Sequence, residues 1–357
     1  MPRQLAYAAA VLAVLLAGCS GETSSPAEGP ASSAGASDSS SSASDSSAGA
    51  SDPSASGSDS SAEAPPNPVS LPAYFAREFD GGDLRLGAVR ERTAGYTSYD
   101  ASYRSGRLRI TGVLNVPTGR GPFPAVVLAH GYIDPAYYVS GQGMTRERGY
   151  LAARGYVAFH VDYRNHAGSD DDPAAARELR LGYSVDVINA VQALRDSRRV
   201  PVDDERVALM GRSMGGGVVY KALEMVPGLV SAAAVWAPVS SLEADNYNRW
   251  IRGDASRSGL DRYVQRKYGL PGTPRSREFW RGVSARTYFD RITEPVLIVQ
   301  GGSDDTCPPR WARASYAALQ KAGVDADLAW YPDEEHAFGP RFFAAMDRTT
   351  GYFDRRW

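Results

Sequence analysis

The amino-acid sequence predicts an α/β domain built on a doubly wound, mostly parallel β-sheet. Short apolar runs bounded by turn residues alternate with helix-spaced segments from Pro124 onward. This alternation is typical of parallel strands that are buried on both faces. Three strands joined by glycine-containing turns come first, which favours an antiparallel start to the sheet. Active sites in sheets of this kind lie at the carboxyl ends of the strands.

The boundaries of the expected elements follow from where each pattern stops. Two helices are closed by a glycine, as helices commonly are. The expected strands are Leu84–Glu91, Tyr96–Arg104, Leu108–Val116, Pro124–Ala129, Val157–Val161, Val207–Met210, Val230–Trp236, Pro295–Gln300 and Ala326–Tyr331. The expected helices are Thr145–Arg154, Ser184–Arg195, Val218–Met225, Arg310–Ala322 and Arg341–Asp347.

Residues 1–18 have the pattern of an export signal. Arg3 precedes a short apolar stretch, Leu5–Leu16, and small residues lead up to Cys19. Such a segment is typical of a secretory signal peptide and is too short for a stable membrane span. Cys19 after Ala-Gly resembles the bacterial lipobox, which implies cleavage before Cys19 and lipidation of its thiol. We expect an exported protein anchored by lipid to the outer face of the cell membrane. The alternative is an ordinary signal peptide with an incidental cysteine.

Residues 19–68 are expected to be a disordered tether, because they are rich in Ser, Ala, Gly and Asp and contain almost nothing apolar to bury. Residues 69–357 then form one large catalytic domain. The formal net charge of −2 gives no reason to expect a nucleic-acid partner. With Cys19 lipidated, Cys307 has no disulfide partner, and no Cys/His cluster has metal-ligand spacing. We expect neither a metal nor a cofactor.

Ser213 is the candidate nucleophile. It lies between the Val207–Met210 strand and the Val218–Met225 helix, with Gly211 and Gly215 two residues to either side. A strand, a sharp turn and a helix with serine at the apex form the Gly-x-Ser-x-Gly elbow of acyl-transferring enzymes. The turn leaves no room for a side chain at either glycine. The pattern alone is equally typical of a glycine-rich turn with an idle serine. The assignment of Ser213 therefore depends on whether a base, an acid and an oxyanion loop lie where the fold needs them.

A base and an acid follow at the ends of the last two strands. Among the four histidines, His336 lies on a loop after the last strand, from which its imidazole can reach Ser213. His160 is expected to pack within a strand, and His130 to shape the loop after one. Asp304 follows the Pro295–Gln300 strand directly, where a carboxylate fixes the histidine tautomer.

Other acidic residues and a further histidine lie near this pair in the sequence or in similar loops. Asp305 is the alternative acid. Glu334 and Glu335 adjoin His336 in the sequence and are expected to face solvent. His166 lies in a loop too early in the chain for the base of such a fold.

Two main-chain N–H groups are expected to form an oxyanion hole. One belongs to Met214, the residue after the nucleophile, and the other to Tyr132 in the loop after the Pro124–Ala129 strand. Residues of about 240–294 form a long polar and aromatic insert before the strand at Pro295. A connection of this length is usually functional, and we expect it to cover the strand ends as a cap. The alternative is a surface excursion without ligand contact.

Three motifs of the chain resemble those of a known family. Gly-Arg-Ser213-Met-Gly-Gly, Gly-Gly-Ser-Asp304-Asp-Thr-Cys-Pro and Tyr-Pro-Asp-Glu-Glu-His336-Ala-Phe follow in this order. They resemble the α/β-hydrolase fold, and in particular the catalytic domain of the prolyl oligopeptidase family of serine peptidases. The resemblance implies that Ser213 is the nucleophile, Asp304 the acid and His336 the base. The larger peptidases of this family carry an N-terminal β-propeller, which the residues before Val69 are not expected to form.

We therefore expect a serine hydrolase that cleaves a small peptide or ester substrate through an acyl-enzyme. A serine-type peptidase is the first interpretation, and a carboxylesterase of the dienelactone-hydrolase kind is the alternative. Two further alternatives are transfer of the acyl group to a cell-envelope acceptor and a binding module that has kept the fold without catalysis.

Overall fold

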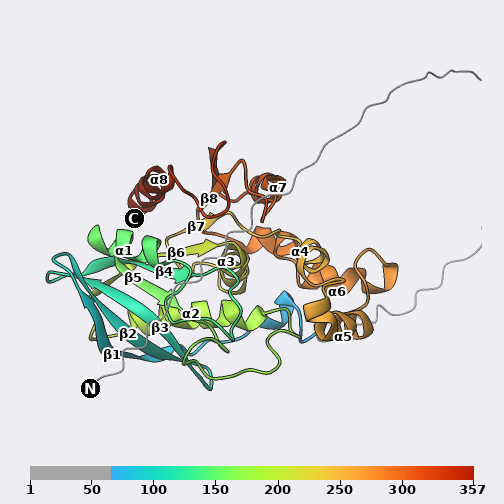
Figure 1. Ribbon diagram of the computed structural model, residues 1–357, viewed down its shortest axis with the longest axis horizontal. Coiled ribbons are helices and arrows are strands. Elements are labelled where there is room, and N and C mark those ends of the chain that lie inside the picture. The colour runs from blue at the N-terminus through green and yellow to red at the C-terminus, as the bar shows by residue number, and fades with distance from the viewer. Residues whose placement is uncertain (1–65) are drawn as a thin grey trace, which may run out of the picture. The chain divides into compact units, whose positions relative to one another are not determined.

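A nine-stranded β-sheet organises the part of the chain that the computed structural model describes, residues 66–357 (Figure 1). The predictions for the signal peptide, for Cys19 and for nearly all of the tether lie outside these residues. The strand order is β1-β2-β3-β5-β4-β6-β7-β8-β9. The strands are β1 (Gly82–Arg92), β2 (Tyr96–Ser105), β3 (Leu108–Pro117), β4 (Phe123–Ala129), β5 (Val157–Val161), β6 (Val202–Arg212), β7 (Ala232–Trp236), β8 (Val296–Gly301) and β9 (Ala326–Tyr331).

The sheet changes from antiparallel to parallel along the chain, as the sequence predicts. The strand pairs β1–β2, β2–β3 and β3–β5 are antiparallel. The pairs from β5 through β4, β6, β7 and β8 to β9 are all parallel. The carboxyl ends of the parallel strands therefore meet at one edge, where the Ser213 elbow, the Asp304 loop and the His336 loop all begin. The predicted fold class, a doubly wound α/β-hydrolase sheet, is confirmed.

Both faces of the central parallel strands are buried. In β4, Val127 packs into one hydrophobic cluster and Val126 and Leu128 into another on the opposite face. The helices α2 (Leu181–Arg195), α3 (Met214–Met225) and α7 (Pro309–Lys321) contribute to the first cluster. The helices α1 (Thr145–Ala153) and α8 (Phe342–Asp354) cover the second and lie side by side in Figure 1.

The insert between β7 and β8 is a small helical unit with a core of its own. It contains α4 (Glu243–Trp250), α5 (Ser258–Tyr268) and α6 (Arg277–Gly282), together with the 3-10 helices η2 (Ala255–Arg257), η3 (Pro274–Ser276) and η4 (Ala285–Arg291). The three α-helices gather beside one end of the sheet (Figure 1). Tyr247, Val264 and Trp280 are buried together in it, and Leu179 of the main domain joins this cluster. We call this insert the cap.

Of the elements that are longer than the sequence pattern indicates, β6 and α8 differ most. β6 begins at Val202, five residues before the predicted strand; the apolar pattern missed this first half because it is mostly polar and only partly buried. α8 continues to Asp354, beyond the predicted end at Asp347. Threonines interrupt its apolar pattern, yet Thr349 and Thr350 donate their hydroxyls to the carbonyls of Ala345 and Met346, one turn earlier. No helix within residues 66–357 combines the length and the apolar character needed to cross a bilayer.

Substitution of Gly215 by alanine should severely destabilise the fold. A Cβ at this position would overlap the main-chain carbonyl of Ala129 in β4, and backbone atoms have little freedom to move away. We expect Gly215→Ala to lower the free energy of unfolding by about 3 kcal/mol or more, as measured by urea denaturation.

The matched control is Gly259→Ala. Gly259 lies in α5, and a Cβ there meets nothing within 4 Å. Because alanine favours helix over glycine, this variant should be unchanged or more stable by about 0.5–1 kcal/mol. Equal stability of the two variants would contradict the close helix–strand contact.

Candidate active site

Ser213 occupies a strained turn between β6 and α3. Its φ and ψ are 57° and −120°, a region that residues with a side chain rarely adopt. Its N–H donates to Trp236 O at 2.9 Å, and its carbonyl accepts from Val239 N at 3.1 Å. A Cβ at Gly211 would overlap the carbonyl of Gly215, just as one at Gly215 would overlap Ala129. The predicted need for glycine at both positions is therefore confirmed.

Asp304 and His336 lie in direct contact. Asp304 is buried, and its Oδ2 accepts from His336 Nδ1 at 2.9 Å. The remaining acceptor positions of the carboxylate are also filled. Oδ2 accepts from Gln300 Nε2 at 3.1 Å, while Oδ1 accepts from Thr306 N at 3.0 Å and from Cys307 N at 2.8 Å. The carboxylate, fixed by these donors, holds the imidazole with Nε2 directed away from it.

Asp305 does not share this position. It is exposed, and its main-chain carbonyl, like that of Thr306, accepts a hydrogen bond from Arg249 of the cap. The structure thus brings Asp304 rather than Asp305 against His336. Glu335 faces solvent as expected, but the expectation for Glu334 is wrong. Glu334 is buried because its carboxylate accepts from the N–H groups of Gly339 and Arg341 and so holds the loop that carries His336.

The hydroxyl of Ser213 has a sulfur neighbour. Ser213 Oγ lies 3.8 Å from Cys307 Sγ. Within residues 66–357 no hydrogen bond joins Ser213 to His336, although both side chains line the same cavity. Contacts of this kind commonly tighten only when substrate binds. Burial, and secondarily the charge of Asp304, raise the pKa of the Cys307 thiol to about 12. The thiol is therefore protonated at neutral pH and does not compete with the serine as a nucleophile.

The two segments expected to provide the oxyanion hole flank Ser213. Met214 is the first residue of α3, where N–H groups have no acceptor within the helix. A Cβ on Gly131 would lie 3.1 Å from Ser213 Cβ, so the loop after β4 passes directly beside the serine. His130 Nδ1 contacts Gly131 O at 2.7 Å. Because carbonyl and N–H point in opposite directions in a trans peptide, this contact turns the N–H of Tyr132 away from His130.

The other three histidines form a buried cluster behind this loop. The rings of His130 and His160 stack at 5.3 Å, and His166 meets His130 edge-on at 5.4 Å. Burial lowers the pKa of His130 to about 4 and also lowers the pKa values of His160 and His166, so all three are neutral at pH 7. The predicted packing role of His160 and the loop-shaping role of His130 are confirmed.

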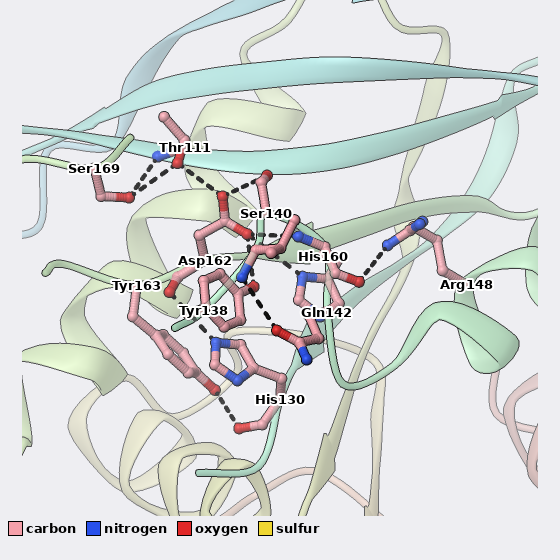
Figure 2. Close-up of polar contacts among 12 residues, drawn as sticks. Thr111, His130, Tyr138, Ser140, Gln142, Arg148, His160, Asp162, Tyr163 and Ser169 are labelled. Atoms are coloured by element: carbon pink, nitrogen blue, oxygen red, sulfur yellow. Dashed lines mark hydrogen bonds and ion pairs between the residues drawn. The ribbon is translucent and has the colours of Figure 1, made fainter. Parts of the chain in front are cut away.

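Asp162 holds the same loop from the end of β5 (Figure 2). Its side chain is fully buried and accepts hydrogen bonds from Thr111, Tyr138, Ser140 and the N–H of Gly141 at 2.7–2.9 Å. β3, the end of β5 and the loop after β4 are thereby tied to one carboxylate. This network anchors the loop beyond Tyr132.

A cavity of about 290 Å³ opens in front of Ser213 and His336. The cap supplies part of its wall, including Asn246, Trp250 and Arg257. Residues of the insert therefore contribute to the cavity beside Ser213.

The cavity also contains charged groups that the sequence analysis missed. Lys221 of α3 pairs with Glu243 of α4 at 2.8 Å, and Arg180 lies at the start of α2. In the sequence, the only indication of this polar wall is Lys221, within the otherwise apolar Val218–Met225 segment. No group of three or more His, Cys, Asp or Glu side chains suited to a metal occurs within residues 66–357.

Several curated proteins resemble about half of this chain. It is 28% identical to dipeptidyl peptidase 4 of Felis catus over 196 residues, 54% of this chain and 24% of that protein. It is 32% identical to prolyl endopeptidase FAP of Homo sapiens over 192 residues, 52% of this chain and 23% of that protein. The chain thus spans about a quarter of the length of these relatives.

Solved structures share the fold. Acetyl xylan esterase 1 from Thermoanaerobacterium sp. JW/SL YS485 superposes with a TM-score of 0.61 and 20% identity, over 80% of this chain and 93% of that one. The acylaminoacyl peptidase of Pyrococcus horikoshii superposes with a TM-score of 0.56 and 21% identity, over 74% of this chain and 42% of that one. Residues 143–355, more than half of the chain and including Ser213, Asp304 and His336, match the prolyl oligopeptidase family. The protein therefore belongs to the prolyl oligopeptidase family and is a serine hydrolase with the α/β-hydrolase fold.

Proposed function

We propose that the protein is a serine-type peptidase in which Ser213, Asp304 and His336 form the catalytic triad. The observation that carries this proposal is the 2.9 Å bond between His336 Nδ1 and buried Asp304, at the cavity that also contains the Ser213 elbow. The bond directs His336 Nε2 away from the carboxylate, so it is the nitrogen left free for the serine. A strained serine, an oriented imidazole and a shared cavity are the elements of acyl transfer.

The reaction follows from these positions. His336 Nε2 takes the Ser213 proton as Oγ bonds to the substrate carbonyl carbon, and the carbonyl oxygen becomes an oxyanion. The N–H groups of Met214 and Tyr132 stabilise this charge, each by a factor typically of about 10²–10³ in turnover. His336 then protonates the leaving amine or alcohol as its bond to carbon breaks. Water, deprotonated by the same imidazole, releases the acyl group and restores Ser213.

A carboxylesterase is the second candidate. The cap supplies part of the cavity wall. The fold match covers 93% of the acetyl xylan esterase chain but only 42% of the acylaminoacyl peptidase chain. A domain of this size suits small esters. The matches to dipeptidyl peptidase 4 and prolyl endopeptidase FAP, at up to 32% identity, favour the peptidase.

Substrate panels distinguish the two candidates. The purified chain is tested on short-chain p-nitrophenyl esters and on aminoacyl or Ala-Pro p-nitroanilides, with Ser213→Ala as the background. We expect anilide cleavage, lowered by roughly 10⁴-fold or more in Ser213→Ala, with the unfolding curve unchanged. Cleavage of esters alone favours the carboxylesterase, and activity retained by Ser213→Ala refutes the triad.

The choice between Asp304 and Asp305 gives a second prediction. Asp304→Asn should lower kcat by roughly 10³–10⁴-fold, because an amide at this position no longer stabilises the imidazolium. Asp305→Asn, next to it but exposed, should change kcat by less than about threefold. Steady-state kinetics on one substrate measure both, and the reverse order would exchange the two roles.

We also propose that lipid on Cys19 anchors the protein to the outer face of the cell membrane, on the basis of the Leu16-Ala-Gly-Cys19 motif. Cys19→Ala should move the protein from the membrane fraction to the soluble one, because the acyl chains lose their attachment point. Cys307→Ala also removes one cysteine and should stay with the membrane. Membrane retention of Cys19→Ala would rule out this anchor.

A further inference from the structure

The cavity in front of Ser213 carries more positive than negative charge. Arg180, Lys221 and Arg257 line it, whereas Glu243 is the lining carboxylate among the described residues. Lys221 and Glu243 neutralise each other across 2.8 Å. Within residues 66–357 neither Arg180 nor Arg257 forms an ion pair. Because the chain as a whole has a formal net charge of −2, this positive charge is a local feature of the cavity.

The two arginines come from different parts of the chain and converge on Tyr132. The guanidinium carbon of Arg257, in the cap, lies 4.7 Å from the centre of the Tyr132 ring, and that of Arg180 lies 5.2 Å from it. Arg257 Nη1 also donates to Trp250 O at 3.0 Å. The other N–H groups of both side chains have no protein acceptor among the described residues. A tyrosine ring attracts a cation only weakly and cannot balance two of them.

Arg180 is held at this position by a strained backbone. Leu179 and Arg180 have φ values of 50° and 60°, where residues with a Cβ pay a conformational cost. Leu179 is buried against the cap cluster, which fixes the turn. Strain that surrounding packing maintains is characteristic of functional positions. Here it directs a cation toward the predicted oxyanion loop.

We propose that this cavity binds substrates with a carboxylate group, which Arg180 and Arg257 hold beside Tyr132 while the scissile carbonyl lies at Ser213. Two guanidinium groups in a partly enclosed site repel each other, and a shared carboxylate removes this repulsion. The planar fork of arginine also matches the two oxygens of a carboxylate. The substrates would be acidic peptides or acyl groups with a second carboxylate. This inference rests on the proposed function, because it assigns a substrate class to the same site.

A matched pair of esters tests the inference. p-Nitrophenyl monoadipate and its methyl ester, p-nitrophenyl methyl adipate, have the same acyl chain and leaving group and differ in one negative charge. The wild-type chain should have the higher kcat/KM for the monoadipate. Arg180→Gln and Arg257→Gln should each lower this kcat/KM roughly tenfold, mainly through KM, because each removes a charged hydrogen bond.

The neutral ester and a distant arginine serve as controls. With the methyl ester, both variants should lose much less kcat/KM than with the monoadipate, because the neutral ester has no carboxylate to bind. Arg199, exposed between α2 and β6, lies before the amino end of β6, away from the cavity. Arg199→Gln should leave both substrates unchanged. Added salt should raise KM for the monoadipate in the wild type and have little effect in the double variant, since salt screens the attraction.

Two outcomes would overturn the inference. In one, the arginine variants lower the rates of both esters equally. These side chains would then support the structure of the site without recognising the carboxylate of the substrate. In the other, the wild type does not favour the monoadipate. Neither outcome affects the proposed catalytic triad, which stands as long as the methyl ester is cleaved through Ser213.

A binding measurement that needs no turnover distinguishes the carboxylate site from the proposed catalytic function. Calorimetry should detect adipate binding to the Ser213→Ala chain, and this binding should weaken when Arg180 or Arg257 is also replaced by Gln. If a fluorophosphonate fails to label wild-type Ser213 and no ester is cleaved, the proposed function fails, while the calorimetry still decides the inference. Equal binding of adipate and dimethyl adipate would refute the carboxylate site.

Discussion

The contact of α3 with β4 is the constraint on which the rest of the site depends. Gly215 packs so closely against the carbonyls of Ala129 and His130 that no side chain fits between them. This contact brings the first turn of α3 to the end of β4 and forces Ser213 into its left-handed conformation. It also sets the position of the Gly131–Tyr132 loop relative to the serine. The strands on both sides of this turn are buried on both faces and hold Ser213 in its strained conformation.

Buried carboxylates then fix the loops that the sheet leaves free. Asp162 binds the segment after β4, Asp304 orients His336, and Glu334 holds the chain beyond it. Each lies near the carboxyl end of a strand and is surrounded by N–H and O–H donors. A buried carboxylate is costly unless its acceptor positions are filled, so each one selects a single loop conformation. The precision of the site therefore comes from polar networks behind it as much as from the core.

The sequence predicts the sheet and the candidate triad because both have local signals. Apolar runs mark the strands, and Ser213, Asp304 and His336 each follow directly after one. The cavity wall has no such signal. Arg180 reaches it through a strained turn, Arg257 through a 3-10 helix of the cap, and Lys221 through its pair with Glu243. These contacts join segments far apart in the chain, and periodicity carries no information about them. The burial of Glu334 was missed for another reason: its partners are the N–H groups of Gly339 and Arg341 in the same loop, and a loop has no periodic pattern that predicts such bonds.

The place of the cap in the topology has a consequence for how such enzymes diversify. The chain leaves the sheet after β7 and returns at β8, and these two strands are direct neighbours. Because the two strands are parallel, the connection leaves at the carboxyl end of β7 and must cross back to the amino end of β8. A crossover of this kind is long in any case, and its outer part can vary in length and shape without altering the register of any strand. Recognition at this site is therefore modular, and evolution or engineering can exchange the cap while the hydrolytic machinery stays in place.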